Sequence, residues 1–216
     1  QGMIFSVSNI VIQAAINHFG AACVAGNSAG LNFEYISYFF VNGFAQATVT
    51  FISQNYAAHQ YQRCRRIARV AMVSAILFTT IVSSVFYLFR YPLVDDIFST
   101  NPAVVHYAII RITFIALLEP LTATYEIAGG SLRGIGHSMA PAVITLVGCC
   151  ILRVVYITVM LPHFTSFTQV ALIYPVTWII TGTAVMLLYE AVTRKAYVTE
   201  NLTVTPNSEM QLMPHH

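Results

Sequence analysis

Two glutamates within one long apolar stretch, Glu119 and Glu126, are the residues best placed to do chemistry in this sequence. They are seven residues apart, so in a helix they share one face and lie about 10 Å apart along the axis. Pro120 removes a backbone hydrogen bond and is expected to bend the helix between them. Two carboxylates on one face of a bent helix are suited to carrying a proton or a cation.

Other ionisable residues in apolar stretches are possible partners for these carboxylates. Glu119 either forms a structural ion pair with Arg153, expected at a matching depth, or belongs to an ion path. Glu126 either braces the loop that follows or continues that path. Glu34 and Arg111 are predicted to pair, as a structural brace or as part of a cavity wall. An ionised group inside a membrane is costly unless it has such a partner or faces water.

The composition of the chain indicates a membrane protein. The 216 residues are 57% hydrophobic and 8% charged, with a mean hydropathy of +0.70, whereas soluble domains are about 25% charged. So few charges cannot cover a soluble globule, which excludes a soluble enzyme and also a disordered chain. The small net charge of +2 and the scattered basic residues argue against a nucleic-acid partner.

Six long apolar stretches predict an all-α membrane protein with six transmembrane helices. A helix needs about 20 residues to span a bilayer, and the stretches lack the strict alternation of β-barrel strands. They cover residues 2–19, 28–53, 70–89, 103–129, 140–161 and 168–189. The polar residues from 196 to 216 are predicted to form a disordered tail.

The positions of the basic residues predict the orientation of these helices. Seven of them lie in alternate loops or near the C-terminus, and the side that carries most basic residues is expected to be cytoplasmic. These are Arg63, Arg65, Arg66, Arg69, Arg133, Arg194 and Lys195. The C-terminus is therefore predicted to be cytoplasmic in a multi-pass protein of the plasma membrane, with a bacterial inner membrane as the expected setting.

The sequence offers no motif for an enzyme or a metal centre. It has no phosphate loop or HExxH motif, and no enzymatic activity is predicted. Its four cysteines lack the spacing of metal ligands and are expected to be buried free thiols. Neither a metal nor an organic cofactor is expected.

Two motifs resemble those of the multidrug and toxic compound extrusion (MATE) transporters. The run GGSLRGIGHS at 129–138, followed by Pro141, resembles the family's G-x-L-R-G-x-G-x-S…P loop. The matching positions include Gly130, Leu132, Arg133, Gly134 and Gly136. FISQNYAA at 51–58, followed by Arg63, resembles the family's F-x-x-Q-N-x-G-A…R segment, with Ala57 where the family has glycine.

The resemblance covers residues 1–195 and implies one lobe of a two-lobe, twelve-helix transporter. The match is to the C-terminal six-helix half, and the abrupt opening at Gln1 is expected to lie within the first helix of that half. The N-terminal six-helix lobe of the same protein would then be its partner. Family members expel organic cations and drugs in exchange for Na⁺ or H⁺ by alternating access, so the resemblance implies the same cation-coupled antiport here.

The resemblance also bears on the residues of the expected substrate and ion pathway. Many family members carry an acid in the tenth helix, where this sequence has Thr122, and Glu119 and Glu126 lie about one turn to either side. The family acid of the seventh helix has no counterpart in residues 1–20, so both Na⁺ and H⁺ stay open as coupling ions. The pathway is predicted to comprise Glu34, Asn42, Gln46, Glu119, Thr122 and Glu126.

Two other functions are compatible with six apolar helices. One is a homo-oligomeric channel or pore, which would need no partner lobe. The other is a lipid-linked sugar flippase of the same superfamily, which would be expected to have a more cationic cavity than Arg111 and Arg153 supply.

Overall fold

The computed structural model describes residues 2–210, with side chains for residues 8–160 and 162–197. Within residues 2–210 the chain is built of helices and contains no strand. In order these are α1 (Gly2–Asn17), α2 (Ala21–Ala57), α3 (Tyr61–Leu88), α4 (Arg90–Ile97), α5 (Pro102–Phe114), η1 (Ala116–Leu121), α6 (Thr122–Gly134), α7 (Met139–Leu146), η2 (Val147–Ile151), α8 (Leu152–Met160), η3 (Leu161–His163) and α9 (Phe167–Met210).

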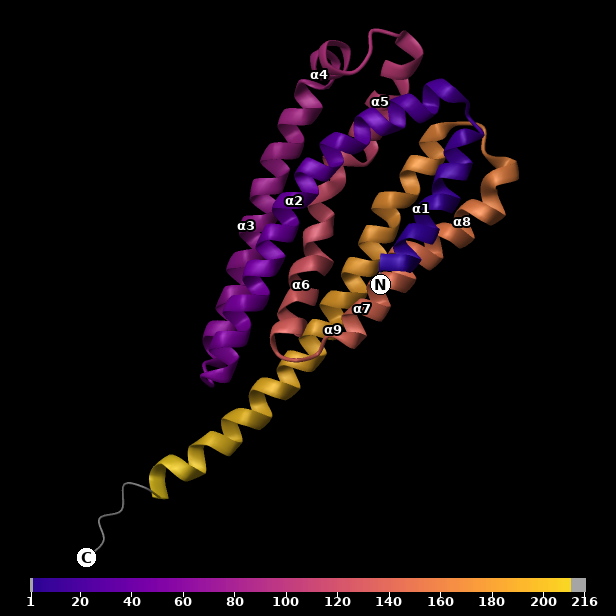
Figure 1. Ribbon diagram of the computed structural model, residues 1–216. Helices are drawn as coiled ribbons and strands as arrows, with labels where there is room; N and C mark the ends of the chain where they lie inside the picture. The colour runs from indigo at the N-terminus through magenta and orange to yellow at the C-terminus, as the bar shows by residue number, and fades with distance from the viewer. Residues whose placement is uncertain (1, 211–216) are drawn as a thin grey trace, which may run out of the picture.

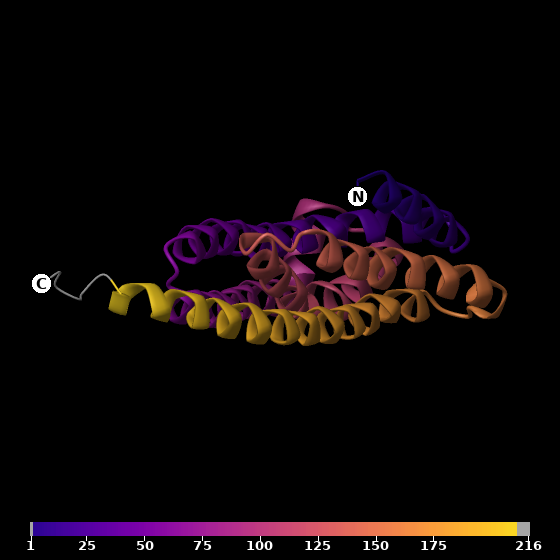
Figure 2. The same cartoon turned by 90° about the horizontal axis from the view of Figure 1, so that it is seen from below.

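The helices of residues 2–210 form six long segments, in agreement with the prediction. α5, η1 and α6 run on as one segment, as do α7, η2 and α8, while α4 is a short extra helix. Figure 2 shows α9 along one side of this bundle and α1 on the opposite side. Four segments are long and apolar enough to cross a membrane: Tyr61–Leu88, Pro102–Gly134, Met139–Met160 and Phe167–Tyr197. The protein is therefore a multi-pass membrane protein.

Residues with positive φ form three of the tight connections. Gly20 (φ 90°) separates α1 from α2, and Gly136 (φ 90°) separates α6 from α7, which glycine allows without a steric penalty. His59 (φ 56°) separates α2 from α3, and its ring Nδ1 lies 2.7 Å from the Tyr61 hydroxyl. These turns are short, so consecutive segments run antiparallel and lie beside one another (Figure 1).

Two regions are more helical than the sequence predicts. Residues 129–136 were expected to form a loop, but α6 continues through them to Gly134 and only Gly136 has the turn conformation. The sequence also predicts disorder from residue 196, whereas α9 continues to Met210; residues 211–216 lie outside the described residues. No glycine or proline interrupts residues 183–205, so the helix has no residue at which to stop.

Two segments contain a turn that is not α-helical. Pro120 lies in η1, a 3-10 turn between α5 and α6, because proline lacks the N–H that an α-helical hydrogen bond needs. η2 is a π-helical turn, which contains one extra residue. At its centre Gly148 faces Thr181 of α9 so closely that a Cβ there would overlap the threonine side chain. Pro120 thus interrupts the α-helix, as expected from its missing N–H, while the π-helical turn was not predicted.

The surface of the bundle matches the expected topology. Large apolar side chains are exposed along the outer helices, among them Val73 and Leu77 on α3 and Ile179 and Leu187 on α9, as in a surface that faces lipid. The start of α3, the end of α6 and the later part of α9 lie at the same end of the bundle (Figure 1). The predicted basic residues therefore gather at one end, and its assignment to the cytoplasm stays a prediction.

Candidate functional site

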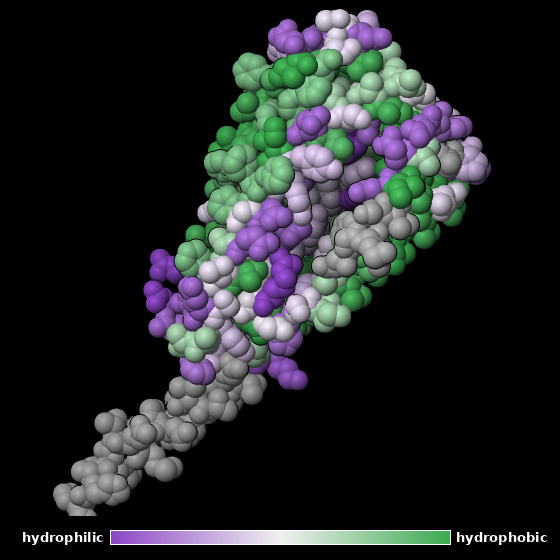
Figure 3. Space-filling model, viewed as in Figure 1, coloured by the Kyte–Doolittle hydropathy of each residue, from purple (hydrophilic) through white to green (hydrophobic). Residues whose placement is uncertain are grey.

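A cavity of about 340 Å³ is lined by five helical segments and brings together ionisable residues from four of them. Its lining includes the carboxylates Glu34, Glu119 and Glu126 and the guanidinium groups of Arg111 and Arg153. Figure 3 shows the hollow on the face that carries α1 and α2, with polar residues beside it and apolar residues at the margins. The residues singled out in the apolar stretches therefore meet in one place.

Glu34 and Arg111 form the ion pair that their positions predict, between α2 and α5. The Arg111 side chain is 3% exposed and that of Glu34 is 13% exposed. The second guanidinium nitrogen of Arg111 donates to Asn27 Oδ1 at 2.5 Å. Gly30 of α2 makes this possible, since a Cβ at Gly30 would lie 2.9 Å from Arg111 Cβ. The pair thus holds α2 against α5 and forms one wall of the cavity.

Glu119 is a buried carboxylate of the cavity with one oxygen that lacks a partner among the described residues. Its side chain lies in η1 and is 2% exposed. Among the described residues, its Oε2 has no hydrogen-bond partner. The neighbouring Thr122 hydroxyl donates to the backbone carbonyl of Glu119 at 2.7 Å. A buried carboxylate oxygen without a partner is costly when ionised, so this position is suited to a proton or a cation.

Arg153 lies in the same cavity but does not pair directly with Glu119. Its Nε donates to Thr177 Oγ1 at 2.9 Å, and its guanidinium lies 4.2 Å from the centre of the Tyr174 ring. No nitrogen of Arg153 lies within 4.0 Å of a carboxylate oxygen among the side chains described. Of the two alternatives for Glu119, the direct ion pair with Arg153 is thus not formed among the described side chains, where α9 supplies other partners for the guanidinium.

Glu126 lines the cavity and also contacts the end of its own helix. Its carboxylate accepts a hydrogen bond from the Tyr38 hydroxyl at 3.0 Å and lies 3.9 Å from Arg133. It thus links α6 to α2 and to the end of its own helix while lining the cavity. Tyr38 is a residue that the sequence analysis missed. Its spacing from Glu34, four residues along α2, is the signal that places both on one face.

Asn42 and Gln46, which were predicted to line the pathway, lie on α2 outside the cavity lining. Gln46 is exposed and donates to Asn42 Oδ1 at 3.5 Å. They follow Tyr38 at four-residue steps, so they continue its face of α2 beyond the cavity. Thr122, in contrast, does line the cavity.

The residues of the family motif pack α6 against α2 next to the cavity. Leu132 is fully buried, and Gly130 and Gly134 face α2 so closely that a Cβ on either would lie about 3 Å from it. Arg133, in the last turn of α6, reaches toward Glu126. In the part of the chain that the structure describes, the four cysteines are free and buried. No group of three or more His, Cys, Asp or Glu side chains there could hold a metal.

Comparison with known proteins identifies the family. The family model MatE matches residues 1–159. The probable multidrug resistance protein NorM of Thermotoga maritima is 24% identical over 164 residues, which are 76% of this chain and 35% of that protein. The protein of the same name from Neisseria meningitidis is 29% identical over 123 residues, 57% of this chain and 27% of that protein. The chain thus spans about a third of these relatives.

Solved structures show the same fold. The crystal structure of MATE in complex with MaL6 matches with a TM-score of 0.82 and 13% identity, over 90% of this chain and 44% of that chain. The bent form of the Vibrio cholerae MATE transporter VcmN matches with a TM-score of 0.80 and 18% identity, over 91% of this chain and 44% of that chain. The MatE match covers most of the sequence and agrees with this fold, so the chain belongs to the MatE family and corresponds to part of a MATE transporter.

Proposed function

We propose that this chain is the C-terminal lobe of a cation-coupled efflux antiporter that expels organic cations by alternating access. Its family and the names of its relatives, which are multidrug resistance proteins, support efflux of drug-like molecules. The N-terminal lobe of the same protein would close the cavity from the other side. Transport between two lobes around a site in mid-membrane is the general pattern of transporters with repeated halves.

The groups around the cavity favour a cationic substrate. Three carboxylates and two guanidinium groups line it, and Glu34 is already neutralised by Arg111. Tyr35 and Trp178 add aromatic faces to the same lining, and such faces attract organic cations. A flippase for an anionic lipid-linked sugar would need an excess of positive charge instead.

The buried Oε2 of Glu119, which lacks a hydrogen-bond partner among the described residues, is the observation that carries the proposal. A group that is 2% exposed and lacks a hydrogen bond at Oε2 among the described residues is stabilised by whatever cation or proton reaches it. Organic cation and coupling ion would then compete for one carboxylate, so that binding of one favours release of the other. Such competition at a single site is sufficient for antiport, whether the ion is Na⁺ or H⁺.

The substitution Glu119→Gln in the full-length protein tests this role. Ion-driven dye efflux in vesicles should fall about tenfold or more, because a contact to a charged group is worth about 1.5–3 kcal/mol. The melting temperature should stay unchanged or rise, since Glu119 has no ion pair to lose.

Glu190→Gln is the matched control, because Glu190 is 55% exposed and lies outside the cavity; its efflux should be unchanged. Equal efflux by Glu119→Gln and the unsubstituted protein would contradict the proposed role of Glu119. Dye movement that needs no ion gradient would contradict antiport and favour a channel.

A further inference from the structure

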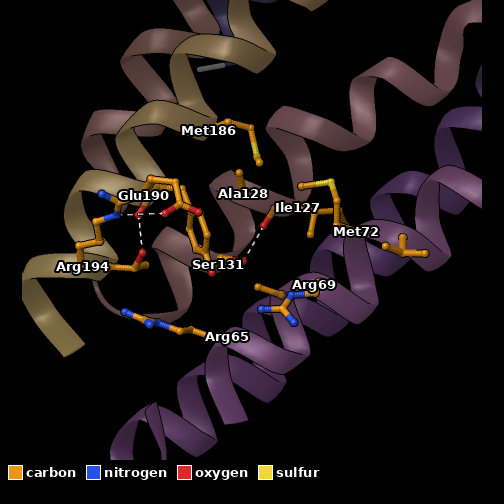
Figure 4. A pocket seen from close by; sticks show the side chains of 13 residues that line it. Arg65, Arg69, Met72, Ile127, Ala128, Ser131, Met186, Glu190 and Arg194 are labelled. Carbon is orange, nitrogen blue, oxygen red and sulfur yellow. Dashed lines mark hydrogen bonds and ion pairs between the residues drawn. The ribbon is translucent and has the colours of Figure 1, made fainter. Parts of the chain in front are cut away.

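A second cavity, of about 400 Å³, lies between α3, α6 and α9, away from the site described above. Figure 4 shows its side chains converging from these three helices, with the arginines on α3 and α9. It lies at the end of the bundle where the basic residues gather. None of its lining residues takes part in the first cavity.

The rim of this second cavity is positively charged. Arg65 and Arg69 lie one turn apart on α3, and Arg194 faces them from α9 (Figure 4). Glu190 pairs with Arg194 at 3.5 Å. Among the side chains described, no carboxylate lies within 4.0 Å of Arg65 or Arg69. Two guanidinium groups therefore face the cavity without a counter-charge from this part of the chain.

The floor of the cavity and the end farther from the arginines are uncharged. Ala68, Ala128 and Ser131 are small and buried, and their size leaves the cavity open where α3 and α9 flank α6. Further along α3 and α9 the lining becomes apolar, at Val73 and Met186. Val73 is eight positions from Arg65 and four from Arg69, which is about 12 Å and about 6 Å along α3, and Met186 is eight positions from Arg194 on α9. Val73 is 52% exposed, so the apolar end opens toward the lipid side.

We propose that this cavity binds one anionic phospholipid from the adjacent leaflet. Arg65 and Arg69 would hold the phosphate, for which the guanidinium fork provides paired hydrogen bonds. The apolar end beside Val73 would receive the first part of an acyl chain. Basic pockets between helices at the cytoplasmic side are suited to anionic headgroups, and the change from charge to apolar surface within one cavity matches a lipid better than a free anion.

Native mass spectrometry of the full-length protein in detergent, titrated with phosphatidylglycerol or phosphatidylcholine, tests the proposal. The protein should retain one phosphatidylglycerol in preference to phosphatidylcholine. Arg65→Gln/Arg69→Gln should weaken retention about tenfold or more, as expected for lost contacts to a charged group. Arg63→Gln/Arg66→Gln is the control, because these arginines lie on the same helix but line a different hollow; it should bind like the unsubstituted protein.

A third variant distinguishes binding of a lipid from binding of free phosphate. It also tests the proposal if the arginine variants fail to fold. Val73→Trp leaves every charge in place and obstructs the apolar end, so retention of phosphatidylglycerol should fall. Unchanged retention would overturn the proposal, as would equal loss in the two arginine pairs, which would indicate diffuse surface charge. Equal protection against thermal unfolding by inorganic phosphate and phosphatidylglycerol at the same concentration would identify a free-anion site and also overturn it.

Discussion

At the scale of single residues, the buried pair of Glu34 and Arg111 should contribute more to stability than any exposed pair described. Glu34→Gln leaves the Arg111 guanidinium buried without its counter-charge, and such a loss costs about 3–5 kcal/mol. The melting temperature of the full-length protein in detergent measures this cost. Glu190→Gln, which breaks an exposed pair with Arg194, should cost about 0–1 kcal/mol. Equal shifts for both variants would contradict a structural role for the buried pair.

The contacts of single residues were only partly predictable. The pairing of Glu34 with Arg111 could be predicted, because a carboxylate and a guanidinium at similar depth in apolar helices have few other partners. The partners of Arg153 could not, since a guanidinium can bind a hydroxyl and an aromatic face as well as a carboxylate. Here it takes Thr177 and Tyr174. Sequence spacing does not show which of these competing contacts is within reach.

At the scale of the helices, Gly134 controls how closely α6 packs on α2. A Cβ at Gly134 would lie 2.9 Å from Ile52 Cγ2 and 3.1 Å from the Val49 carbonyl oxygen. Gly134→Ala should therefore destabilise the full-length protein by about 1–3 kcal/mol, the usual cost of overpacking. The melting temperature and the yield of folded protein are the measurements.

Gly43→Ala provides the matched control for this change. Gly43 also lies in a helix, α2, but no atom lies within 4 Å of the position of its Cβ. Alanine there should be neutral or stabilising by about 0.4–1 kcal/mol, because it reduces the freedom of the unfolded chain. If both substitutions stabilised the protein, helix propensity would outweigh close packing at Gly134, and the proposed role of Gly134 would be contradicted.

Helices were predicted well where their residues are apolar and less well where glycine occurs. The six segments follow from runs of apolar residues, and four of the helical segments in the described part of the chain are long and apolar enough to span a bilayer. The glycine-rich residues 129–136 predict a loop, yet most of them are helical, because α2 approaches closely enough to need glycine at Gly130 and Gly134. Glycine thus marks either a turn or a close helix contact, and only the tertiary structure distinguishes the two.

At the scale of the whole molecule, residues 1–216 expressed alone should transport nothing. The chain covers only 44% of the solved MATE structure bound to MaL6, and on α2 the polar side chain of Gln46 is exposed beyond the cavity. If a second lobe supplies the other wall of the cavity, as proposed, this chain alone cannot alternate between two sides of a membrane. Dye efflux from cells that express only this chain, normalised to membrane-inserted protein and compared with the full-length protein, checks the prediction. Efflux above background would favour a homo-oligomeric pore.

The π-helical turn at Val147–Ile151 has a consequence for how relatives of this protein diverge. Each residue of an α-helix turns the chain by about 100°, and the π-helical turn accommodates one residue more than a regular turn. The Arg153 side chain therefore points toward Tyr174 of α9. In an uninterrupted α-helix the same side chain would be rotated by about 100° around the helix axis. Evolution gains or loses such a turn by inserting or deleting a single residue. Homologous side chains can then keep their place in space while their positions in aligned sequences differ by one.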